Sequence, residues 1–555
     1  MAASRNAASV PVDRLVDRRS FFKRMAALSA VAPAGALIPL AGCSTLPAVE
    51  TAQPPRQAAR SRRITSPHAY AATVRPEAIA DATELTIAEA ARLIRDRRLT
   101  PTELVDTYLA RITAFDGTYR AFNTVLAESA RAEAARLRSA SHSGALHGIP
   151  LGIKDLFYTA GVATTANSFI FKDFVPEFDA TCVARLREQG AITLGKTQMG
   201  PLATTRATTP TGEITTVNAW TPEEPSVSPG GSSSGSATAV AGRLATSSIG
   251  TQTGGSITSP SNAQGLTGLK PTMSRVSGYG VIPLSYTRDH IGPIARDAKD
   301  AAIVLQAIAG YDGHDPRTAG LPLVPDLIEA ATPVRRNGRT AVRWPTTVGV
   351  LPEYSSGDSA NAKARAAMLA DLERTGIRLV EVKLPQDWEI LTGGAFNNVR
   401  LVERSEQLLE YMKKDVRLFG VSLSSWINGL FLSGDEYLKG QRAKLLLLRR
   451  VLDDLFARCD VVVQTSNVPF DIIGLPEIAF PIGFEQTGER TRPIGAILGG
   501  LPYAEDRLLA VVAAYQSITD WHLRRPKDPS TAAGNRDAQR DRGVIRLEDV
   551  SELTE

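Results

Sequence analysis

The feature that most constrains this chain of 555 residues is the stretch between positions 225 and 260, where two glycine-rich tracts enclose a short apolar segment. The first tract contains Gly230-Gly231-Ser232, and the second contains Gly254-Gly255-Ser256. Glycine lets a backbone approach a ligand closely and turn its N–H groups toward it, and a serine nucleophile needs both. The enclosed residues 237–241 are small and apolar, which predicts a buried helix and not a linker. Ser232 and Ser256 are therefore candidates for nucleophilic chemistry.

A serine nucleophile also needs a base, and here the best candidate is a lysine. None of the six histidines lies in a serine-hydrolase context. Upstream, the run Gly148-Ile-Pro-Leu-Gly-Ile-Lys-Asp155 is apolar and strand-like as far as Lys154. A lysine drawn into the interior by such a strand loses its hydration, which lowers its pKa and allows the neutral amine to act as a base.

Taken together, these motifs resemble those of the amidase signature hydrolases. The resemblance extends, more thinly, from about residue 84 to 526. Its strongest motifs are the run around Lys154, Pro229-Gly-Gly-Ser-Ser-Ser-Gly-Ser-Ala237, Gly254-Gly-Ser256, Gly268-Leu-Lys-Pro-Thr272 and Asp289-His-Ile-Gly-Pro293.

The resemblance implies a Ser-cisSer-Lys triad. By motif, Ser256 is the nucleophile, Ser232 is the bridging serine on a cis peptide, and Lys154 is the base, with Ser233 as a supporting hydroxyl. The backbone N–H groups of the nucleophile loop are the candidate oxyanion hole. They belong to Thr253, Gly254, Gly255 and Ser256. Chemistry of this kind requires no metal or cofactor.

The expected fold class is α/β. Short apolar strands, such as residues 149–156 and 191–196, alternate with helices. Capping boxes at Thr86 and Thr100 mark two helix starts. The resemblance refines this expectation to the amidase signature fold, a mixed twisted β-sheet flanked by helices in a single large domain.

Two residues beside the nucleophile depart from the family pattern. Relatives commonly pair an aspartate with an arginine where this chain has Gln252 and Thr258. Because both charges are lost together, no buried charge is left without a partner, so the change is compatible with activity. We expect a variant support for the nucleophile loop and, as a further consequence, a less rigid oxyanion hole.

The N-terminus predicts export. Asp17-Arg-Arg-Ser-Phe-Phe-Lys23 resembles a twin-arginine signal, and an apolar stretch then leads to Leu40-Ala-Gly-Cys43, which resembles a lipoprotein box. Residues 1–43 are therefore predicted to be a signal peptide, with Cys43 lipidated. The expected partners are the twin-arginine export machinery and, through the lipid anchor, the periplasmic side of a bacterial membrane. Alternatively, Cys43 is simply a small residue near an ordinary cleavage site.

Composition divides the rest of the chain into three segments, and the distribution of charge argues against a nucleic-acid partner. Residues 44–82 read as a flexible tether, 83–526 as the catalytic domain and 527–555 as a charged tail that is disordered. The net charge of +5 is concentrated in residues 1–43, which carry +4, so no basic surface argues for nucleic acid.

The favoured function is hydrolysis of a small-molecule amide. An esterase or carbamate hydrolase is the alternative, because the same acyl-enzyme chemistry cleaves those bonds. The family also includes a transamidation subunit that acts on charged tRNA, and the export signal and the absence of a basic surface argue against that role. A non-catalytic amidase-fold lipoprotein is less favoured because Lys154, Ser232 and Ser256 are all present.

Overall fold

The computed structural model describes residues 64, 66–70, 79, 81–142 and 144–530, and these belong to one compact unit. The predicted signal peptide, with Cys43, and most of the predicted tail lie outside the described residues. Four apolar residues of the predicted tether, Ile64, Ala69, Tyr70 and Ile79, are buried in this unit. No helix in the described part of the chain is both long enough and apolar enough to span a membrane.

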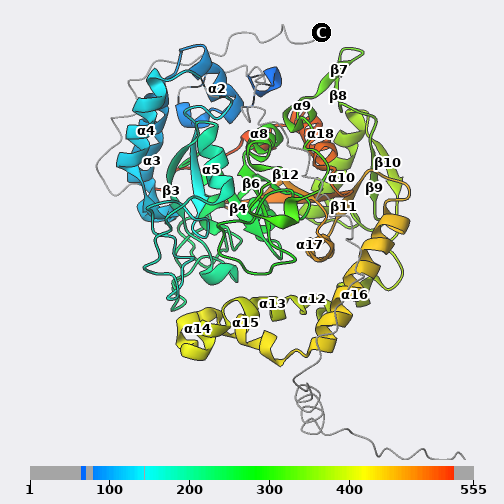
Figure 1. Ribbon diagram of the computed structural model, residues 1–555. Helices are drawn as coiled ribbons and strands as arrows, with labels where there is room; N and C mark the ends of the chain where they lie inside the picture. The colour runs from blue at the N-terminus through cyan, green and yellow to red at the C-terminus, as the bar shows by residue number, and fades with distance from the viewer. Residues whose placement is uncertain (1–63, 65, 71–78, 80, 143, 531–555) are drawn as a thin grey trace, which may run out of the picture. The chain divides into compact units, whose positions relative to one another are not determined.

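An eleven-stranded mixed sheet forms the centre of the domain (Figure 1). Its strands run in the order β1 (Phe122–Val125), β3 (Ile192–Thr197), β2 (Pro150–Lys154), β4 (Ser247–Gln252), β6 (His290–Ala295), β5 (Thr267–Lys270), β12 (Glu477–Thr487), β13 (Arg490–Gly500), β11 (Val461–Gln464), β9 (Thr347–Val350) and β10 (Arg378–Glu381). A separate two-stranded sheet pairs β7 (Val334–Arg336) with β8 (Arg339–Ala341).

Strand β2 has the burial pattern that its sequence predicts. It pairs in parallel with β3 on one side and with β4 on the other, and all five of its residues are buried. A strand covered on both faces needs a continuous apolar run, and residues 149–153 supply it. Lys154 ends this strand and is therefore carried into the interior.

Two groups of helices pack on the sheet and confirm the α/β class. In one group, α8 packs on α5, α9 and α18, and α18 also contacts β12. In the other, α6 packs on β4 and α7, and α7 contacts β13. Their bounds are α5 (Thr181–Glu188), α6 (Ser234–Ala241), α7 (Thr258–Gln264), α8 (Ala298–Ile308), α9 (Leu327–Ala330) and α18 (Glu505–Gln516). The predicted buried helix in residues 237–241 is thus α6, every residue of which is buried.

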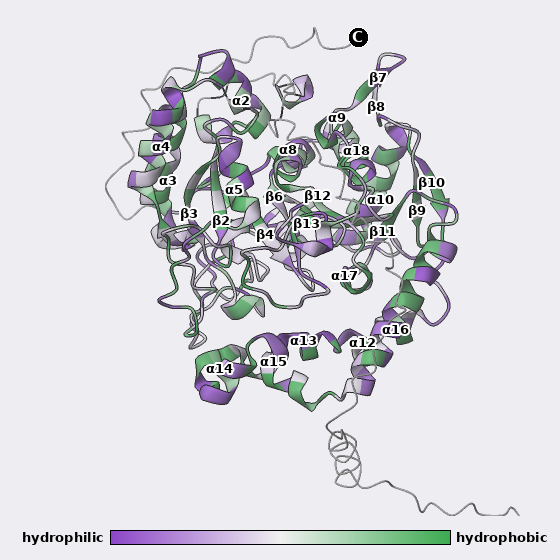
Figure 2. Ribbon diagram, in the orientation of Figure 1, coloured by the Kyte–Doolittle hydropathy of each residue, from purple (hydrophilic) through white to green (hydrophobic). Residues whose placement is uncertain are grey.

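The remaining helices lie toward the two ends of the chain. The N-terminal ones are α2 (Ile87–Arg95), α3 (Pro101–Tyr119) and α4 (Ala127–Ser139), and both predicted capping boxes are present at α2 and α3. The later ones are α10 (Ala360–Arg374), α11 (Trp388–Thr392), α12 (Gly394–Asn397), α13 (Arg400–Gln407), α14 (Leu409–Lys414), α15 (Leu423–Ile427), α16 (Gly434–Arg450) and α17 (Val468–Ile473). Figure 2 shows hydrophilic and hydrophobic residues alternating along α16.

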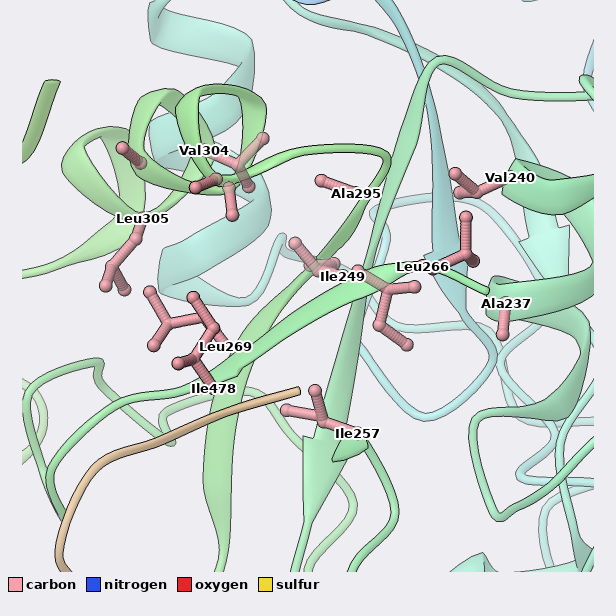
Figure 3. Close-up of a cluster of buried hydrophobic side chains, with 14 of the residues drawn as sticks. Ala237, Val240, Ile249, Ile257, Leu266, Leu269, Ala295, Val304, Leu305 and Ile478 are labelled. Carbon is pink, nitrogen blue, oxygen red and sulfur yellow. The ribbon is translucent and has the colours of Figure 1, made fainter. Parts of the chain in front are cut away.

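The core is continuous through the sheet. In Figure 3, Ile249 of β4 lies between Val304 of α8 and Val240 of α6, and Leu269 of β5 and Ile478 of β12 lie on the α8 side. All five of these residues are fully buried. The first serine tract therefore leads into a helix that is packed into the core, and the second follows β4, the strand on which this helix packs.

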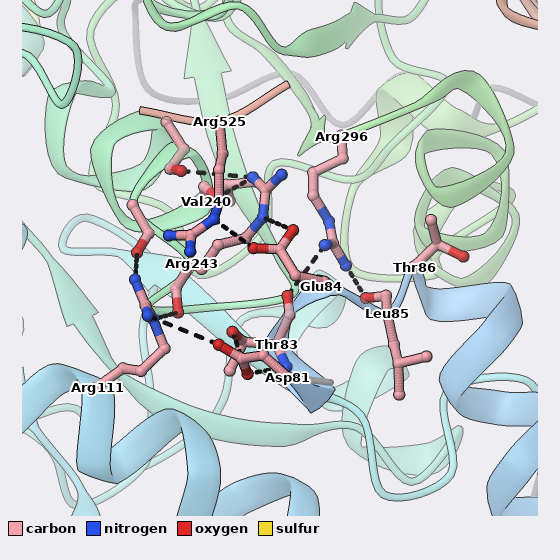
Figure 4. A network of polar contacts seen from close by, with 12 residues as sticks. Asp81, Thr83, Glu84, Leu85, Thr86, Arg111, Val240, Arg243, Arg296 and Arg525 are labelled. Carbon is pink, nitrogen blue, oxygen red and sulfur yellow. Dashed lines mark hydrogen bonds and ion pairs between the residues drawn. The ribbon is translucent and has the colours of Figure 1, made fainter. Parts of the chain in front are cut away.

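A partly buried polar network joins the start of the domain to its C-terminal end (Figure 4). Glu84 accepts a hydrogen bond from Arg243 Nε at 3.1 Å, and its other oxygen lies 2.6 Å from Arg525 Nε. Burial would raise the pKa of Glu84, but Arg243 and Arg525 outweigh burial and lower that pKa to about 2. The network thus holds together segments that lie more than 400 residues apart in the sequence.

Candidate active site

The candidate base lies inside the domain, at the carboxyl end of β2. Lys154 has no exposed surface. Its Nζ contacts three hydroxyls: Ser232 Oγ at 2.9 Å, Ser233 Oγ at 3.0 Å and Thr251 Oγ1 at 2.8 Å. The structure therefore brings together Lys154, Ser232 and Ser233, three of the residues that the sequence singled out.

Burial favours the neutral form of the Lys154 amine over the protonated form. It lowers the pKa of Lys154 to about 7, and Asp289 has a smaller, opposite effect. No carboxylate among the described residues forms an ion pair with this lysine. The neighbouring Asp155 turns instead to Lys196, whose Nζ lies 3.2 Å from the carboxylate. About half of the Lys154 amines are therefore neutral at pH 7 and able to accept a proton.

The hydroxyls around Lys154 have a defined hydrogen-bond direction. The Ser233 hydroxyl donates to the Thr251 carbonyl at 3.4 Å, so Ser233 accepts its second hydrogen bond from Lys154. Thr251 Oγ1 takes another N–H of the amine. The protonated amine can donate to all three hydroxyls. A neutral amine has two N–H groups and one lone pair, so when Ser233 and Thr251 accept its two N–H groups, its lone pair accepts the Ser232 hydroxyl.

Thr251 was not among the predicted site residues. Its sequence signal is weak, because it differs from other strand residues only in standing two positions before Thr253, on the strand that leads into the nucleophile loop. Only the parallel pairing of β2 with β4 brings its hydroxyl to Lys154.

The first serine tract packs closely on the helix that follows Ser256. The peptide bond between Gly231 and Ser232 is cis, as the resemblance implied. Gly230 has φ +78°, and a Cβ there would lie 2.4 Å from Cα of Pro260 in α7. Only glycine allows this approach, which sets the tract beside the nucleophile loop.

Ser256 lies in the turn between β4 and α7. It is 9% exposed, whereas Ser232 is 2% exposed, and Gly254 between β4 and Ser256 is exposed. Among the described residues, no hydrogen bond joins the Ser256 and Ser232 hydroxyls. The geometry therefore defines the lysine end of the predicted relay, and the Ser256 hydroxyl has no hydrogen-bond partner among the residues that the structure describes.

The predicted oxyanion donors are backbone N–H groups of the turn between β4 and α7. Within the described part of the chain, the N–H groups of Gly254, Gly255 and Ser256 have no acceptor, so they are available to a ligand oxygen. Gly255 has φ +89°, which favours glycine. The start of the turn is fixed by Thr253, whose hydroxyl donates to Asp289 Oδ1 at 2.5 Å.

Gln252 braces the nucleophile loop in place of the usual ion pair. Its Oε1 accepts hydrogen bonds from the N–H groups of Ile257 and Thr258, each at 2.9 Å. Its Nε2 donates to Asp471 Oδ1 at 2.8 Å and to Glu477 Oε2 at 3.0 Å. Both amide atoms are thus used, and these contacts favour a well-supported loop over the less rigid one that the sequence suggested.

Replacing Gln252 with leucine should destabilise the protein by about 3 kcal/mol and lower kcat/KM about tenfold. The change leaves two buried N–H groups without an acceptor and removes a donor from Asp471 and Glu477. Thermal unfolding and steady-state kinetics measure the two effects. Gln486→Leu, at an exposed position of the β12–β13 hairpin, is the control. Equal stability of the two variants would show that Gln252 does not support the loop.

Metal-ligand clusters and cysteine thiols are further features that could carry chemistry. Among the described residues, no group of three or more His, Cys, Asp and Glu side chains is arranged to hold a metal ion. Cys182 and Cys459 are buried free thiols. Cys43, the predicted lipidation site, lies outside the described residues.

Comparison with known proteins identifies relatives of this fold. The family model described as Amidase matches residues 103–465. A glutamyl-tRNA(Gln) amidotransferase subunit of Roseiflexus sp. (strain RS-1) is 34% identical over 488 residues, which cover 80% of this chain and 99% of that protein. The native peptide amidase of Stenotrophomonas maltophilia is 28% identical with a TM-score of 0.70, covering 82% of this chain and 100% of its own. An amidase family protein from Bacillus anthracis str. Ames is 26% identical with a TM-score of 0.68, and the match covers 81% of this chain and 93% of that protein.

This chain belongs to the amidase family. The predicted family and the predicted fold, a large mixed sheet flanked by helices in one α/β domain, are both confirmed. The family and its solved relatives also show that the protein is an amide-hydrolysing enzyme.

Proposed function

We propose that this enzyme hydrolyses a linear carboxylic amide through an acyl-enzyme on Ser256, with Ser232 as the proton relay and Lys154 as the base. The observation that carries the proposal is the buried Lys154 amine, which contacts the Ser232 hydroxyl at 2.9 Å and has a pKa lowered to about 7. A neutral amine in this position can take a proton from Ser232 near neutral pH. Ser233 and Thr251 hold the amine in place.

Acylation begins when Ser256 Oγ attacks the carbonyl carbon. The Ser256 proton passes to Ser232 Oγ, and the Ser232 proton passes to Lys154 Nζ. The negative charge that forms on the carbonyl oxygen meets the N–H groups of Thr253, Gly254 and Gly255. Each such donor lowers the barrier by about 3 kcal/mol.

Collapse of this intermediate breaks the C–N bond. Ser232 gives a proton to the leaving nitrogen and recovers one from Lys154, so the amine departs neutral. Water then attacks the carbonyl carbon of the acyl-enzyme, with water as the nucleophile and Ser256 as the leaving group. Its proton passes through Ser232 to Lys154, and Ser256 leaves with a proton as the carboxylic acid is released.

The substrate is a small-molecule amide, and hydrolysis of esters or carbamates remains the alternative because both pass through the same acyl-enzyme. The Roseiflexus relative is named as part of a tRNA amidotransferase. For this chain, the predicted export signal favours a stand-alone hydrolase. A non-catalytic role is disfavoured because Lys154, Ser232 and Ser256 are all retained.

Mass spectrometry of products from a mixed panel tests the proposal. The panel contains primary amides, anilides, C-amidated peptides, aminohexanoate oligomers, and matched esters and carbamates. A fluorophosphonate probe, which reacts with activated serines, is applied in parallel. Amide cleavage with labelling at Ser256 supports the proposal, and cleavage of esters or carbamates alone favours the alternative. Failure of both cleavage and labelling would point to a non-catalytic protein.

We further propose that the enzyme is exported by the twin-arginine route and anchored through a lipid on Cys43. Replacing Cys43 with serine should abolish incorporation of labelled palmitate and move the protein from the membrane fraction to the soluble periplasmic fraction, because the lipid chains provide the anchor. Replacing Arg18 and Arg19 together with lysine should retain the precursor in the cytoplasm. Ser44→Ala is the control and should leave lipidation unchanged. Membrane association of Cys43→Ser without label would contradict the anchor.

A further inference from the structure

Helix α13 is fastened to the loop that supports the nucleophile. Glu403 of this helix is buried and accepts a hydrogen bond from Ser285 Oγ at 2.6 Å. The loop that contains Ser285 ends at Asp289, which accepts the hydrogen bond from Thr253. Two polar contacts, one buried and one partly buried, therefore connect α13 to the start of the nucleophile loop.

Arg400 and Arg404 stand one helical turn apart on α13, so they leave the helix on the same face. Burial lowers the pKa of both arginines, and the nearby carboxylates of Asp289, for Arg404, and Asp471, for Arg400, oppose this effect only in part. Asp289 holds Thr253, while Asp471 accepts a hydrogen bond from Asn467, whose side chain packs against Gly255. Both arginines are thus within electrostatic reach of the carboxylates that hold the nucleophile loop.

The charge of Arg404 is not balanced within the described residues. Its side chain is 9% exposed, its Nε is buried without a hydrogen-bond partner, and it forms no ion pair there. The Nη1 of Arg400 donates to Asn397 O and Asn398 Oδ1, which are both neutral. Burial and the neighbouring Arg400 lower the pKa of Arg404 to about 10 despite the opposing effect of Asp289, as expected for a cation that no carboxylate contacts directly.

The buried carboxylates of this region are already occupied by other donors. Glu403 accepts from Ser285, Thr287 and Tyr437; Asp289 accepts from Thr253 and the N–H groups of Leu284 and Ser285; Asp471 accepts from Gln252 and Asn467. A buried guanidinium that the protein leaves unpaired is costly unless a ligand supplies the anion.

We infer that Arg404, with Arg400 beside it, binds a carboxylate group of the substrate, so that the enzyme acts on amides that also carry an acidic group. This inference rests on the amide hydrolysis proposed above and names its substrate class. A guanidinium presents N–H groups in a fork that matches a carboxylate. A substrate without the acidic group leaves the buried arginine unpaired. The enzyme should therefore discriminate strongly between amides that carry a carboxylate and amides that lack one.

Matched substrates test this directly. Adipamic acid and hexanamide differ in that a carboxylate replaces a methyl group, and ammonia release by the full chain gives kcat/KM for each. We expect the wild type to prefer adipamic acid by about 100-fold. Arg404→Met should remove most of this preference by lowering kcat/KM for adipamic acid, with hexanamide changed by less than about threefold. Monoamides from malonamic to suberamic acid, each with its alkyl partner, cover the chain length.

Protection of Ser256 from a fluorophosphonate probe provides a readout without turnover. Adipate should slow labelling of the wild type and have little effect on Arg404→Met, whereas inorganic phosphate and the neutral compound 1-hexanol should slow labelling of neither protein. Arg449→Met is the matched control, because this arginine is exposed on α16 with 80% of its side chain accessible. It should keep the wild-type preference and the wild-type protection.

The outcomes separate this inference from the proposed function. Normal Ser256 labelling with equal turnover of acidic and alkyl amides at every chain length would overturn the carboxylate site and leave amide hydrolysis standing. Selective protection by phosphate would also overturn it. If Arg404→Met fails to fold, Arg404→Lys decides, because a folded lysine variant that shows no altered preference contradicts the inference. Absence of both labelling and turnover in the wild type would overturn the two together.

Discussion

Replacing Ser256 with alanine should reduce kcat for amide hydrolysis by roughly 10⁴- to 10⁶-fold. The proposed acyl-enzyme cannot form without this hydroxyl, so only the oxyanion donors and substrate binding remain to assist water. The fold should be unaffected, because the Ser256 side chain has no hydrogen-bond partner among the described residues. Ammonia release measures kcat, and the thermal unfolding midpoint checks that the variant is folded.

Ser259→Ala is the matched control for this experiment. Ser259 lies three positions further along, in α7, and is exposed. Its replacement should leave kcat within about threefold of the wild type, as expected for a surface position. Fluorophosphonate labelling should be lost in Ser256→Ala and kept in Ser259→Ala. More than a tenth of the wild-type kcat in a folded Ser256→Ala would show that the nucleophile is another residue.

The residues of the site that could be predicted are those whose signal is local. Glycines next to Ser232 and Ser256 mark tight backbone turns, and the apolar run before Lys154 marks a buried strand. Each signal depends on composition over fewer than ten residues and on the periodicity of a single element. The α/β class followed from the same kind of pattern, and the family motifs supplied the fold.

The contacts that could not be predicted depend on pairing across the chain. Gln252 meets Asp471 and Glu477, which lie 219 and 225 positions away, because β5 and β12 pair next to the β4–β6 pair. The sequence pattern indicated that an ion pair is absent at Gln252, but the hydrogen bonds that replace it are a property of the sheet order. The sequence also does not reveal that Arg404 is buried, with Arg400 partly buried on the same face of α13, because a charged helix usually faces solvent.

The pH dependence of the reaction should reveal the neutral form of Lys154. Burial lowers the pKa of this amine to about 7, so below pH 7 the lysine is protonated and cannot accept the Ser232 proton. We therefore expect kcat/KM to fall about tenfold for each pH unit below about 7 and to level off above it. Steady-state kinetics between pH 5 and 9, with a substrate that does not titrate in this range, measure the profile.

Replacing Lys154 with methionine should lower kcat/KM by roughly 10³- to 10⁴-fold and abolish this pH dependence, because no base remains to titrate. Lys154→Arg separates the chemistry from packing. Arginine keeps a positive charge and has no available lone pair near neutral pH, so it should be as inactive as methionine. Lys363→Met, at an exposed position of α10, should keep both the wild-type rate and the wild-type profile. Substantial activity in Lys154→Arg would mean that the lysine acts by holding Ser232 and Ser233 in place and not by accepting a proton.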